Sequence, residues 1–491
     1  MTKKFTPSLV TSAGPAVSKS HSTSASTPDL QYANLCKDDP NTACLSRKLY
    51  RWNRDHWQVQ TAEQCEQDAF DWLANFDPAR ATVSMARACA DAAKLKSGRL
   101  PEPEKDRTII PVIGSWLVVE GDGSIHAIEP DRSIGICHRI QSSKPIPLGP
   151  YVPQPLDPES LFAKFLNKSL PDPQVQALVQ EYIGYTLTPT ASRQQAQIWI
   201  GNTGSNGKST LLNIVRALHE KAAAMRLDGL KGFELEPMLG ASLAFCDEAP
   251  QGHINQQILK TLIAGGELPI RGLYEKGGSY APQAKWILCT NHLPKFRDTS
   301  TAWWRRFHVI EWNQRVTGSD IIHDLDRRIV KTELDLVLDW ALAGLQRLIR
   351  QKNFAVPQQV EAAKQKSMQE TDSVKEWVEN CGVALSTLPS QMISKAELSA
   401  RYRDHCDQQG LMPFGHGEFC KRLNAIFPTV KEDRPVLTVD GKKERVRRLG
   451  LMLGHFDVSG TTTTDPHAER DAMLMANIPT ADEDFDPFKN R

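Results

Sequence analysis

A short apolar run that leads into a glycine-rich turn and then a helix is the feature that most restricts the fold of this chain. The run Ile198–Ile200 continues into Gly201-Asn202-Thr203-Gly204-Ser205-Asn206-Gly207-Lys208-Ser209-Thr210, and residues 211–219 have a helical pattern. Glycines let backbone N–H groups turn inward around phosphate oxygens, and the helix N-terminus adds unpaired donors. The pattern predicts an α/β phosphate-binding loop, in which Lys208 contacts the β- and γ-phosphates and the Ser209 hydroxyl coordinates Mg²⁺.

One position departs from the strict form of this loop. That form places a glycine at position 202, where this chain has Asn202, with Gly201 one residue earlier. Asparagine adopts left-handed backbone conformations more readily than most residues, so the turn can survive the change. A structural turn without a ligand is the alternative, but the strand and the helix on either side favour nucleotide binding. We expect a nucleotide to be bound by Gly204, Ser205, Asn206, Gly207, Lys208, Ser209 and Thr210.

Two further apolar runs end in polar residues of the kind that nucleotide hydrolysis requires. The run 241–246 is followed by Asp247 and Glu248, and the run 286–289 is followed after one residue by Asn291. We assign Asp247 to the Mg²⁺ ion, Glu248 to the attacking water, and Asn291 to holding that water against the γ-phosphate. A surface acid pair and a plain asparagine turn are the alternatives, and the order of these runs after the loop argues against both.

Several segments carry a resemblance to a known family. They are Gly204-x-Asn206-Gly207-Lys208-Ser209-Thr210, Asp247-Glu248, Ile263-Ala264-Gly265-Gly266-Glu267, Cys289-Thr290-Asn291-His292-Leu293-Pro294 and Trp304-Arg305-Arg306-Phe307-x-Val309-Ile310. In this order the chain resembles the superfamily 3 helicases, most closely the phage and plasmid primase–helicase group with its poxvirus-like ATPase, over about residues 105–350. The resemblance implies an AAA+-type P-loop ATPase core, ring-shaped hexamers that hydrolyse ATP between subunits, and translocation on single-stranded DNA.

The resemblance also implies residues that act on the nucleotide of a neighbouring subunit. Arg306, directly before the apolar run 307–312, matches the family's arginine finger, and the adjacent Arg305 is the alternative. A guanidinium in that place would stabilise the charge of the transition state. Lys260 matches a second cation that acts in trans, with an ordinary solvated lysine as the alternative.

A β-hairpin that projects into the pore of the ring is a further implication of the resemblance. The matching segment is 268–285, in which Arg271, Tyr274 and Lys276 flank the candidate turn Gly277-Gly278. Cations beside an aromatic ring suit contact with single-stranded nucleic acid, because the ring stacks on bases and the cations follow the backbone. A solvated loop is the alternative.

Composition shifts and hydrophobic periodicity divide the chain into segments. We expect a disordered tail at 1–28, an N-terminal α+β domain at 29–155, a helical collar segment at 156–190, the ATPase core at 191–320, post-core helices at 321–365, a winged-helix-like domain at 373–453 and a disordered acidic tail at 454–491.

The winged-helix-like domain is inferred from the order helix, helix, helix, hairpin, with Asp440-Gly441 as the turn signal. A basic third helix and a basic hairpin suit contacts with the phosphates of duplex DNA. The candidate DNA-binding residues are Lys421, Arg422, Lys442, Lys443, Arg445 and Arg447. A solvated hairpin on a domain that contacts other subunits is the alternative.

Charge and composition exclude several classes of protein. Lys and Arg number 59 and Asp and Glu number 58, for a formal net charge of +1, so the chain lacks the large basic excess of a protein that coats nucleic acid. No run reaches the 18 apolar residues of a membrane span, so we expect no membrane partner. The ten scattered cysteines include no Cys-x-x-Cys pair, which favours reduced thiols in a cytosolic compartment. The resemblance to phage and plasmid proteins implies that this compartment is the cytoplasm of a bacterial host cell.

The leading hypothesis is a DNA helicase that uses ATP and Mg²⁺ to replicate a phage, a plasmid or another mobile element. Its expected partners are single-stranded and forked DNA, further copies of itself in a homo-hexamer, and a separate primase or single-stranded-DNA-binding protein. The alternative is a nucleotide-gated initiator that marks an origin and recruits a host helicase. A bifunctional primase–helicase is not expected, because no polymerising site is evident before Leu156.

Overall fold

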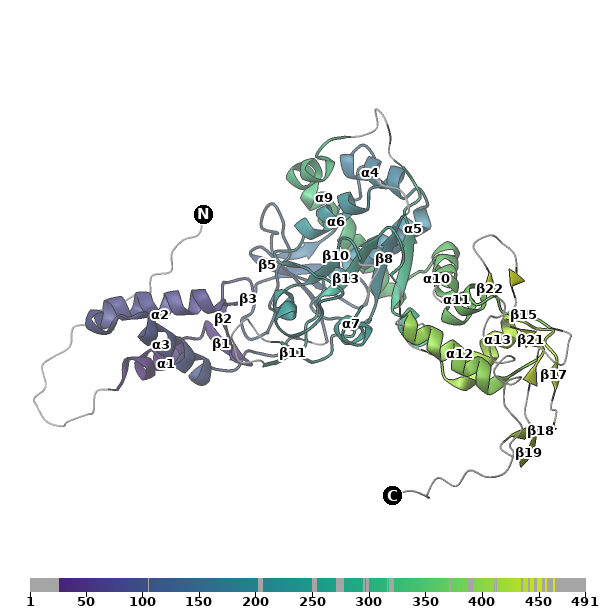
Figure 1. Ribbon diagram of the computed structural model, residues 1–491. Coiled ribbons are helices and arrows are strands. Elements are labelled where there is room, and N and C mark those ends of the chain that lie inside the picture. The colour runs from purple at the N-terminus through teal and green to yellow at the C-terminus, as the bar shows by residue number, and fades with distance from the viewer. Residues whose placement is uncertain are drawn as a thin grey trace, which may run out of the picture. The chain divides into compact units, whose positions relative to one another are not determined.

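Two compact units make up the computed structural model of the chain, and each is described by itself (Figure 1). The first unit comprises residues 26–51 and 60–100, and the second comprises residues 52–59 and the chain from residue 101 onward. The structure describes residues 26–463 except for 105, 202–205, 250–253, 271–277, 295, 297–299, 316, 318–321, 371, 387–391, 410, 412, 434–435, 440–441, 446–447, 453–454 and 457–461.

The first unit is helical and carries one β-hairpin. Its elements are α1 (Pro28–Asp38), β1 (Thr42–Leu45), β2 (Lys48–Trp52), α2 (Ala62–Phe76), the 3-10 turn η1 (Pro78–Arg80) and α3 (Val83–Lys96). Helix α2 begins at a capping box, in which the side chain of Thr61 accepts from the backbone of Gln64 and the side chain of Gln64 accepts from the backbone of Thr61. The helices bury Tyr32, Cys36, Ala69, Leu73 and Cys89 between them, so this unit has a core of its own.

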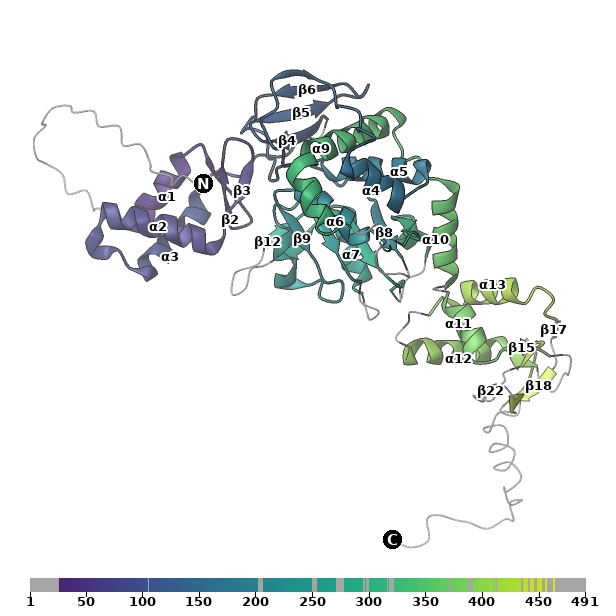
Figure 2. The ribbon, with the colours of Figure 1, turned by 90° about the horizontal axis from the view of Figure 1, so that it is seen from above.

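A four-stranded antiparallel sheet opens the main part of the second unit. After β3 (Trp57–Val59), the strands β4 (Thr108–Val112), β5 (Ser115–Val119), β6 (Ile125–Ile128) and β7 (Gly149–Tyr151) pair in chain order. Figure 2 shows β4, β5 and β6 beside α9 (Leu325–Gln351). Two side chains of α9 fix this arrangement, because Gln346 donates to the carbonyl of Gly123 over 2.7 Å and Arg350 donates to the carbonyl of Asp122 over 2.9 Å.

A five-stranded parallel sheet forms the centre of the second unit. Its order is β14-β8-β13-β10-β9, so strands that follow one another in sequence are not all neighbours in space. The elements are β8 (Ala196–Ile200), α6 (Lys208–Ala217), β9 (Ala222–Ala224), η2 (Gly232–Met238), β10 (Leu243–Cys246), α7 (Gln256–Ile263), β11 (Leu268–Ile270), β12 (Gly278–Tyr280), β13 (Lys285–Thr290), α8 (Thr301–Trp304) and β14 (Phe307–Glu311). This parallel sheet with its helices confirms the α/β prediction.

Both faces of the parallel sheet are buried, and side chains of each strand alternate between them. In β13, Ile287 and Cys289 point to one apolar cluster, while Trp286 and Leu288 belong to the other. The strands therefore read as nearly continuous apolar runs, as expected for a parallel sheet that is covered on both sides.

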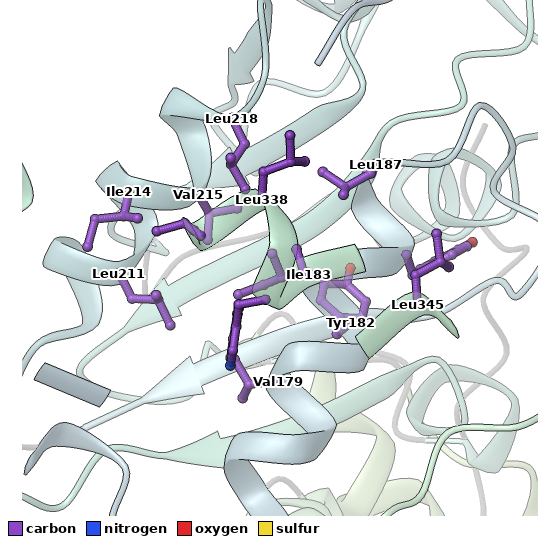
Figure 3. Close-up of a cluster of buried hydrophobic side chains, with 14 of the residues drawn as sticks. Val179, Tyr182, Ile183, Leu187, Leu211, Ile214, Val215, Leu218, Leu338 and Leu345 are labelled. Atoms are coloured by element: carbon purple, nitrogen blue, oxygen red, sulfur yellow. The ribbon is translucent and has the colours of Figure 1, made fainter. Parts of the chain in front are cut away.

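Three helices pack their apolar faces together on one side of this sheet. They are α5 (Pro173–Thr186), α6 and α9, and Figure 3 shows Ile183, Val215, Leu338 and Leu345 among the side chains that meet there. Helix α4 (Leu161–Ser169) joins the same cluster through Phe162, whose ring meets that of Trp340 edge-on at 5.1 Å. The elements of the predicted helical collar thus share a core with the helix that follows the loop.

The C-terminal module has its own small core. After α10 (Gln358–Glu370), it contains α11 (Ser373–Asn380), β15 (Ala384–Leu385), β16 (Ile393–Ser394), α12 (Lys395–Gln408), α13 (His416–Ile426), β17 (Glu432–Asp433), β18 (Val436–Val439), β19 (Lys442–Arg445), β20 (Arg448–Leu449) and β21 (Leu451–Met452). Trp377, Tyr402 and Phe419 are buried at its centre. The predicted order of three helices and a hairpin is present, with Val439 of β18 paired with Lys442 of β19.

The structure divides one of the expected ranges between its two units and describes only part of two others. The range 29–155 is divided between the two units, because the apolar face of the sheet β4–β7 needs cover and shares a cluster with α4, α5 and α9. In the range 454–491, the described residues include the paired strands β22 (His455–Phe456) and β23 (Thr462–Thr463), and most other residues lie outside the described part. Residues 1–25 of the predicted N-terminal tail also lie outside it, and α1 begins at Pro28.

Candidate active site

The residues predicted to handle a nucleotide follow three neighbouring strands of the parallel sheet. Strand β13 lies between β8 and β10, and Thr290 at its end pairs with Ile200 at the end of β8. Because the three strands are parallel, their carboxyl ends lie at one edge of the sheet, which is where open α/β sheets bind ligands. The glycine-rich loop after β8, Asp247 after β10 and Asn291 after β13 therefore lie at the same edge.

The turn into α6 depends on Gly207. Its φ of 90° lies in the left-handed region, and helix α6 begins at the next residue. The preceding residue, Asn206, is buried, and its amide donates to the carbonyl of Trp312 over 3.3 Å. The residues predicted to bind phosphate include Gly204 and Ser205, which lie outside the described residues, while Thr210 lies in the first turn of α6.

Lys208 is a buried cation whose partners are neutral. Only 6% of the residue is exposed, and its Nζ donates to the carbonyl of Gly201 over 3.1 Å and to Oδ1 of Asn291 over 3.2 Å. Burial lowers the pKa of Lys208, against the smaller opposing influence of Cys289 and Asp247. An anion that entered this site would compensate the desolvated charge, as a phosphate does.

Ser209 and Asp247 form the candidate metal site. Both residues are exposed, and the Ser209 hydroxyl lies 3.4 Å from Oδ1 of Asp247. In the described part of the chain, no group of three or more His, Cys, Asp or Glu side chains is arranged to hold a metal ion. Two protein oxygens fit Mg²⁺, because this ion usually keeps few protein ligands and completes its shell with phosphate oxygens and waters.

Glu248 lies beside these groups. It is exposed at the end of β10, next to Asp247. The backbone N–H of the following residue, Ala249, donates to the carbonyl of Cys289 over 3.0 Å, which ties this segment to β13. The five side chains that the sequence assigned to chemistry at this edge, Lys208, Ser209, Asp247, Glu248 and Asn291, thus come from adjoining strand ends.

Arg305 and Arg306 stand at the opposite edge of the sheet. Phe307 opens β14 and pairs with Ala196, the first residue of β8, whereas the loop leaves the other end of β8. Five residues at about 3.3 Å each place the two edges about 16 Å apart. These arginines therefore lie away from the Lys208 of their own chain.

The two arginines differ in their surroundings. Arg305 is exposed, while Arg306 is half-buried and donates from Nη1 to the carbonyl of Ala302 in α8. Both follow Trp303 and Trp304, which are fully buried, so the backbone that carries them is firmly anchored. Lys260 on α7 lies near the same helix, with its Nζ 5.9 Å from the ring centroid of Trp303.

The residues predicted to contact DNA are only partly described. Arg271, Tyr274 and Lys276 lie outside the described residues, but β11 and β12 on either side of them pair antiparallel, with Ile270 opposite Gly278. Arg447 also lies outside the described residues. Lys442, Lys443 and Arg445 all belong to β19.

The structure distinguishes the two candidates on α13. Lys421 is exposed, as a phosphate contact requires. Arg422 instead pairs with Asp372 at 2.6 Å and Glu418 at 3.0 Å, and its guanidinium stacks 4.1 Å from the ring centroid of Phe414. The proposed contact of Arg422 with DNA stays a prediction, and the structure adds that its charge is paired with two carboxylates of the same module.

Two contacts of the loop were not predicted. The side-chain amide of Asn206 donates a hydrogen bond to the carbonyl of Trp312. The last turn of α4 packs against Gly207, so closely that a Cβ built on this glycine would lie 2.6 Å from Oγ of Ser169. Neither contact could be predicted from the sequence. The first is made by a backbone carbonyl, which every residue has, and the second by a serine in a helix, which no motif distinguishes from other serines.

None of the helices in the described part of the chain combines the length and the apolar character that crossing a membrane requires.

Comparisons with known proteins give limited matches. No curated protein matches the chain. The apo structure of the NrS-1 C-terminal region (305–718) is 13% identical, with a TM-score of 0.43, and the comparison covers 86% of this chain and 99% of that one. The A form of the same region is 14% identical at a TM-score of 0.39, over 83% and 94% of the two chains. These scores carry no statement about function. Residues 199–306, from the loop to the arginine pair, are similar to a family of unknown function, DUF5906.

Proposed function

We propose that this chain is an ATP-hydrolysing DNA helicase of the superfamily 3 type, with an AAA+-type core and a winged-helix-like C-terminal domain, that serves the replication of a phage, plasmid or mobile element. The observation that carries the proposal is the convergence of Lys208, Ser209, Asp247 and Asn291 at one edge of the parallel sheet. A buried cation, two oxygens suited to Mg²⁺ and an amide are the groups that phosphoryl transfer to water needs.

Each of these groups has a distinct chemical part in the proposal. Lys208 binds the β- and γ-phosphates, and the N–H groups at the start of α6 add their dipole. Ser209 and Asp247 hold Mg²⁺, which supplies neutralisation of the charge on the phosphate oxygens. Glu248 and Asn291 orient and polarise the attacking water.

The position of the arginine pair supports hydrolysis between subunits. One chain holds its arginines at the edge opposite its own loop, so an arginine that stabilises the transition state must come from another copy. A ring of like subunits, such as the proposed homo-hexamer, meets this requirement, because each copy presents its arginine edge to the loop edge of the next.

Contact with single-stranded DNA is proposed for the segment between β11 and β12, and contact with duplex DNA for Lys421 and strand β19. The hairpin base formed by β11 and β12 supports the first, and the exposure of Lys421 supports the second. Such backbone contacts give affinity with little sequence information.

Turnover of ATP and unwinding of a forked DNA duplex by the purified chain test this function. Lys208→Ala should lower ATP turnover by about a hundredfold or more, because it removes the charge that binds the phosphates. Lys331→Ala, at an exposed lysine of α9, is the matched control and should leave turnover unchanged. Turnover without unwinding would favour an initiator that recruits another helicase. Unchanged turnover in Lys208→Ala would refute the proposal.

A further inference from the structure

Ser169 has a buried hydroxyl group without a hydrogen-bond partner among the described residues. The residue is 1% exposed and ends helix α4, and among the described residues no hydrogen-bond partner lies within reach of its Oγ. A buried polar group without a partner is unfavourable, and native structures rarely keep one without a reason. A serine near a helix end could donate to the carbonyl four residues earlier, but this hydroxyl does not.

This hydroxyl lies against the loop that precedes Lys208. A Cβ added to Gly207 would lie 2.6 Å from Oγ of Ser169 and 3.0 Å from Cε2 of Phe165, so the last turn of α4 directly contacts the turn of the loop. Gly207 is the residue whose left-handed backbone starts helix α6. The unpartnered oxygen is thus next to the helix N-terminus, where the proposed site presents its N–H groups to an anion.

Hydrogen bonds at both ends of helix α4 fix the position of Ser169. At its start, the backbone N–H groups of Leu161 and Phe162 donate to the two carboxylate oxygens of Glu333 over 3.0 and 2.9 Å. At its end, the carbonyl of Leu170 accepts from the amide of Gln176 over 2.6 Å. A helix fixed at both ends holds the hydroxyl at the loop in advance of binding.

We infer that Ser169 is a nucleotide-binding residue, whose hydroxyl donates a hydrogen bond to a phosphate oxygen when the loop is filled. This inference rests on the proposed nucleotide site. An ionised oxygen is a strong acceptor for O–H, so a bound phosphate would satisfy a hydroxyl that has no partner among the described residues. Helix α4 would then close one side of the site, a role that its sequence gives no sign of.

Binding of MgADP and of a non-hydrolysable Mg·ATP analogue tests the inference. Ser169→Ala should weaken both by about tenfold to a hundredfold, the effect of one hydrogen bond to a charged group. Its thermal stability without nucleotide should be equal to that of the wild type or higher, since no existing hydrogen bond is lost. The matched control is Ser115→Ala in β5, which also removes a buried hydroxyl without a partner in the described residues, and it should bind nucleotide normally.

The outcomes separate this inference from the proposed function. Suppose that the wild type binds nucleotide and Lys208→Ala does not. If Ser169→Ala then binds nucleotide as tightly as the wild type, the inference about Ser169 is overturned while the proposed function stands. A fall in the stability of nucleotide-free Ser169→Ala would overturn it too, because the hydroxyl would then have a structural role. Wild type that binds neither nucleotide would overturn the function and the inference together.

Discussion

The side-chain nitrogen of Lys208 donates a hydrogen bond to Oδ1 of Asn291 over 3.2 Å, so the cation of the glycine-rich loop touches the amide at the end of β13. The two residues are 83 positions apart in sequence. They meet because β13 inserts between β8 and β10 in the sheet. A bound nucleotide that attracts Lys208 would break this hydrogen bond. The side-chain amide of Asn291 would then be available for other partners only when a nucleotide is bound.

Asn291 should affect turnover more than binding. Asn291→Ala removes the amide proposed to hold the water, so ATP turnover should fall by about ten- to a hundredfold with little change in nucleotide affinity. Asn291→Asp places a carboxylate beside the buried Lys208, and the resulting ion pair should weaken nucleotide binding as well. Separate measurement of kcat and of the dissociation constant checks both variants. Equal loss of affinity in both would contradict the assigned role.

Gly184 should be required for the contact between α5 and α9. A Cβ at this position would lie 2.7 Å from the backbone nitrogen of Leu345 and 2.9 Å from its Cβ, so the helices would have to separate. Gly184→Ala should lower the free energy of unfolding by about 1–3 kcal/mol, measured by chemical denaturation. Gly121→Ala is the control, since nothing lies within 4 Å of its added Cβ, and it should change stability little.

Lys285 should make stability depend on pH above neutrality. The residue is 2% exposed, donates to the carbonyl of Thr188 and lies 5.4 Å from the ring centroid of Tyr185, and burial lowers its pKa from 10.5 to about 7. Between these values the unfolded chain binds a proton that the folded chain does not, so this group raises stability with increasing pH, by up to about 1.4 kcal/mol per pH unit.

Replacement by methionine isolates this effect. Lys285→Met should be more stable than wild type at pH 7, and the difference between the two proteins should shrink as the pH rises towards 10. Burial lowers the pKa of the neighbouring His138 to about 3 and that of His219 well below its usual range, so in the folded protein both stay neutral across this window. A difference in unfolding free energy that does not vary with pH would contradict the account.

The motifs of this site that consist of adjacent residues could be predicted from the sequence. The contacts between residues far apart in the sequence could not. The strand, turn and helix around Lys208 are encoded by adjacent residues, and the assignments of Asp247 and Asn291 followed from apolar runs in order. Ser169 lies on another helix, so its contact with Gly207 depends on how α4 packs. The ion pair of Arg422 with Asp372 has the same origin, because Asp372 lies 50 residues away and a count of local charge does not include it.

Arg305 and Arg306 should have separable roles, although the resemblance to the helicase family favours Arg306 as the finger and leaves Arg305 as the alternative. Arg306 donates to the carbonyl of Ala302, so Arg306→Ala should lower the stability of the isolated chain by about 1 kcal/mol. Arg305 is exposed, so Arg305→Ala should leave stability unchanged and lower ATP turnover sharply. Thermal unfolding and turnover of the two variants check this. Full ATP turnover in Arg305→Ala would indicate that Arg306 is the arginine finger.

Mixing two inactive variants tests most directly whether adjoining copies build each site together. Lys208→Ala and Arg305→Ala should each turn over little ATP alone. In a random mixture of the two, about a quarter of the sites would combine an intact loop with an intact arginine from the neighbour, so turnover should return to about that fraction of wild type. A mixture that stays inactive although both variants assemble, or full turnover by dilute single copies of wild type, would contradict the account.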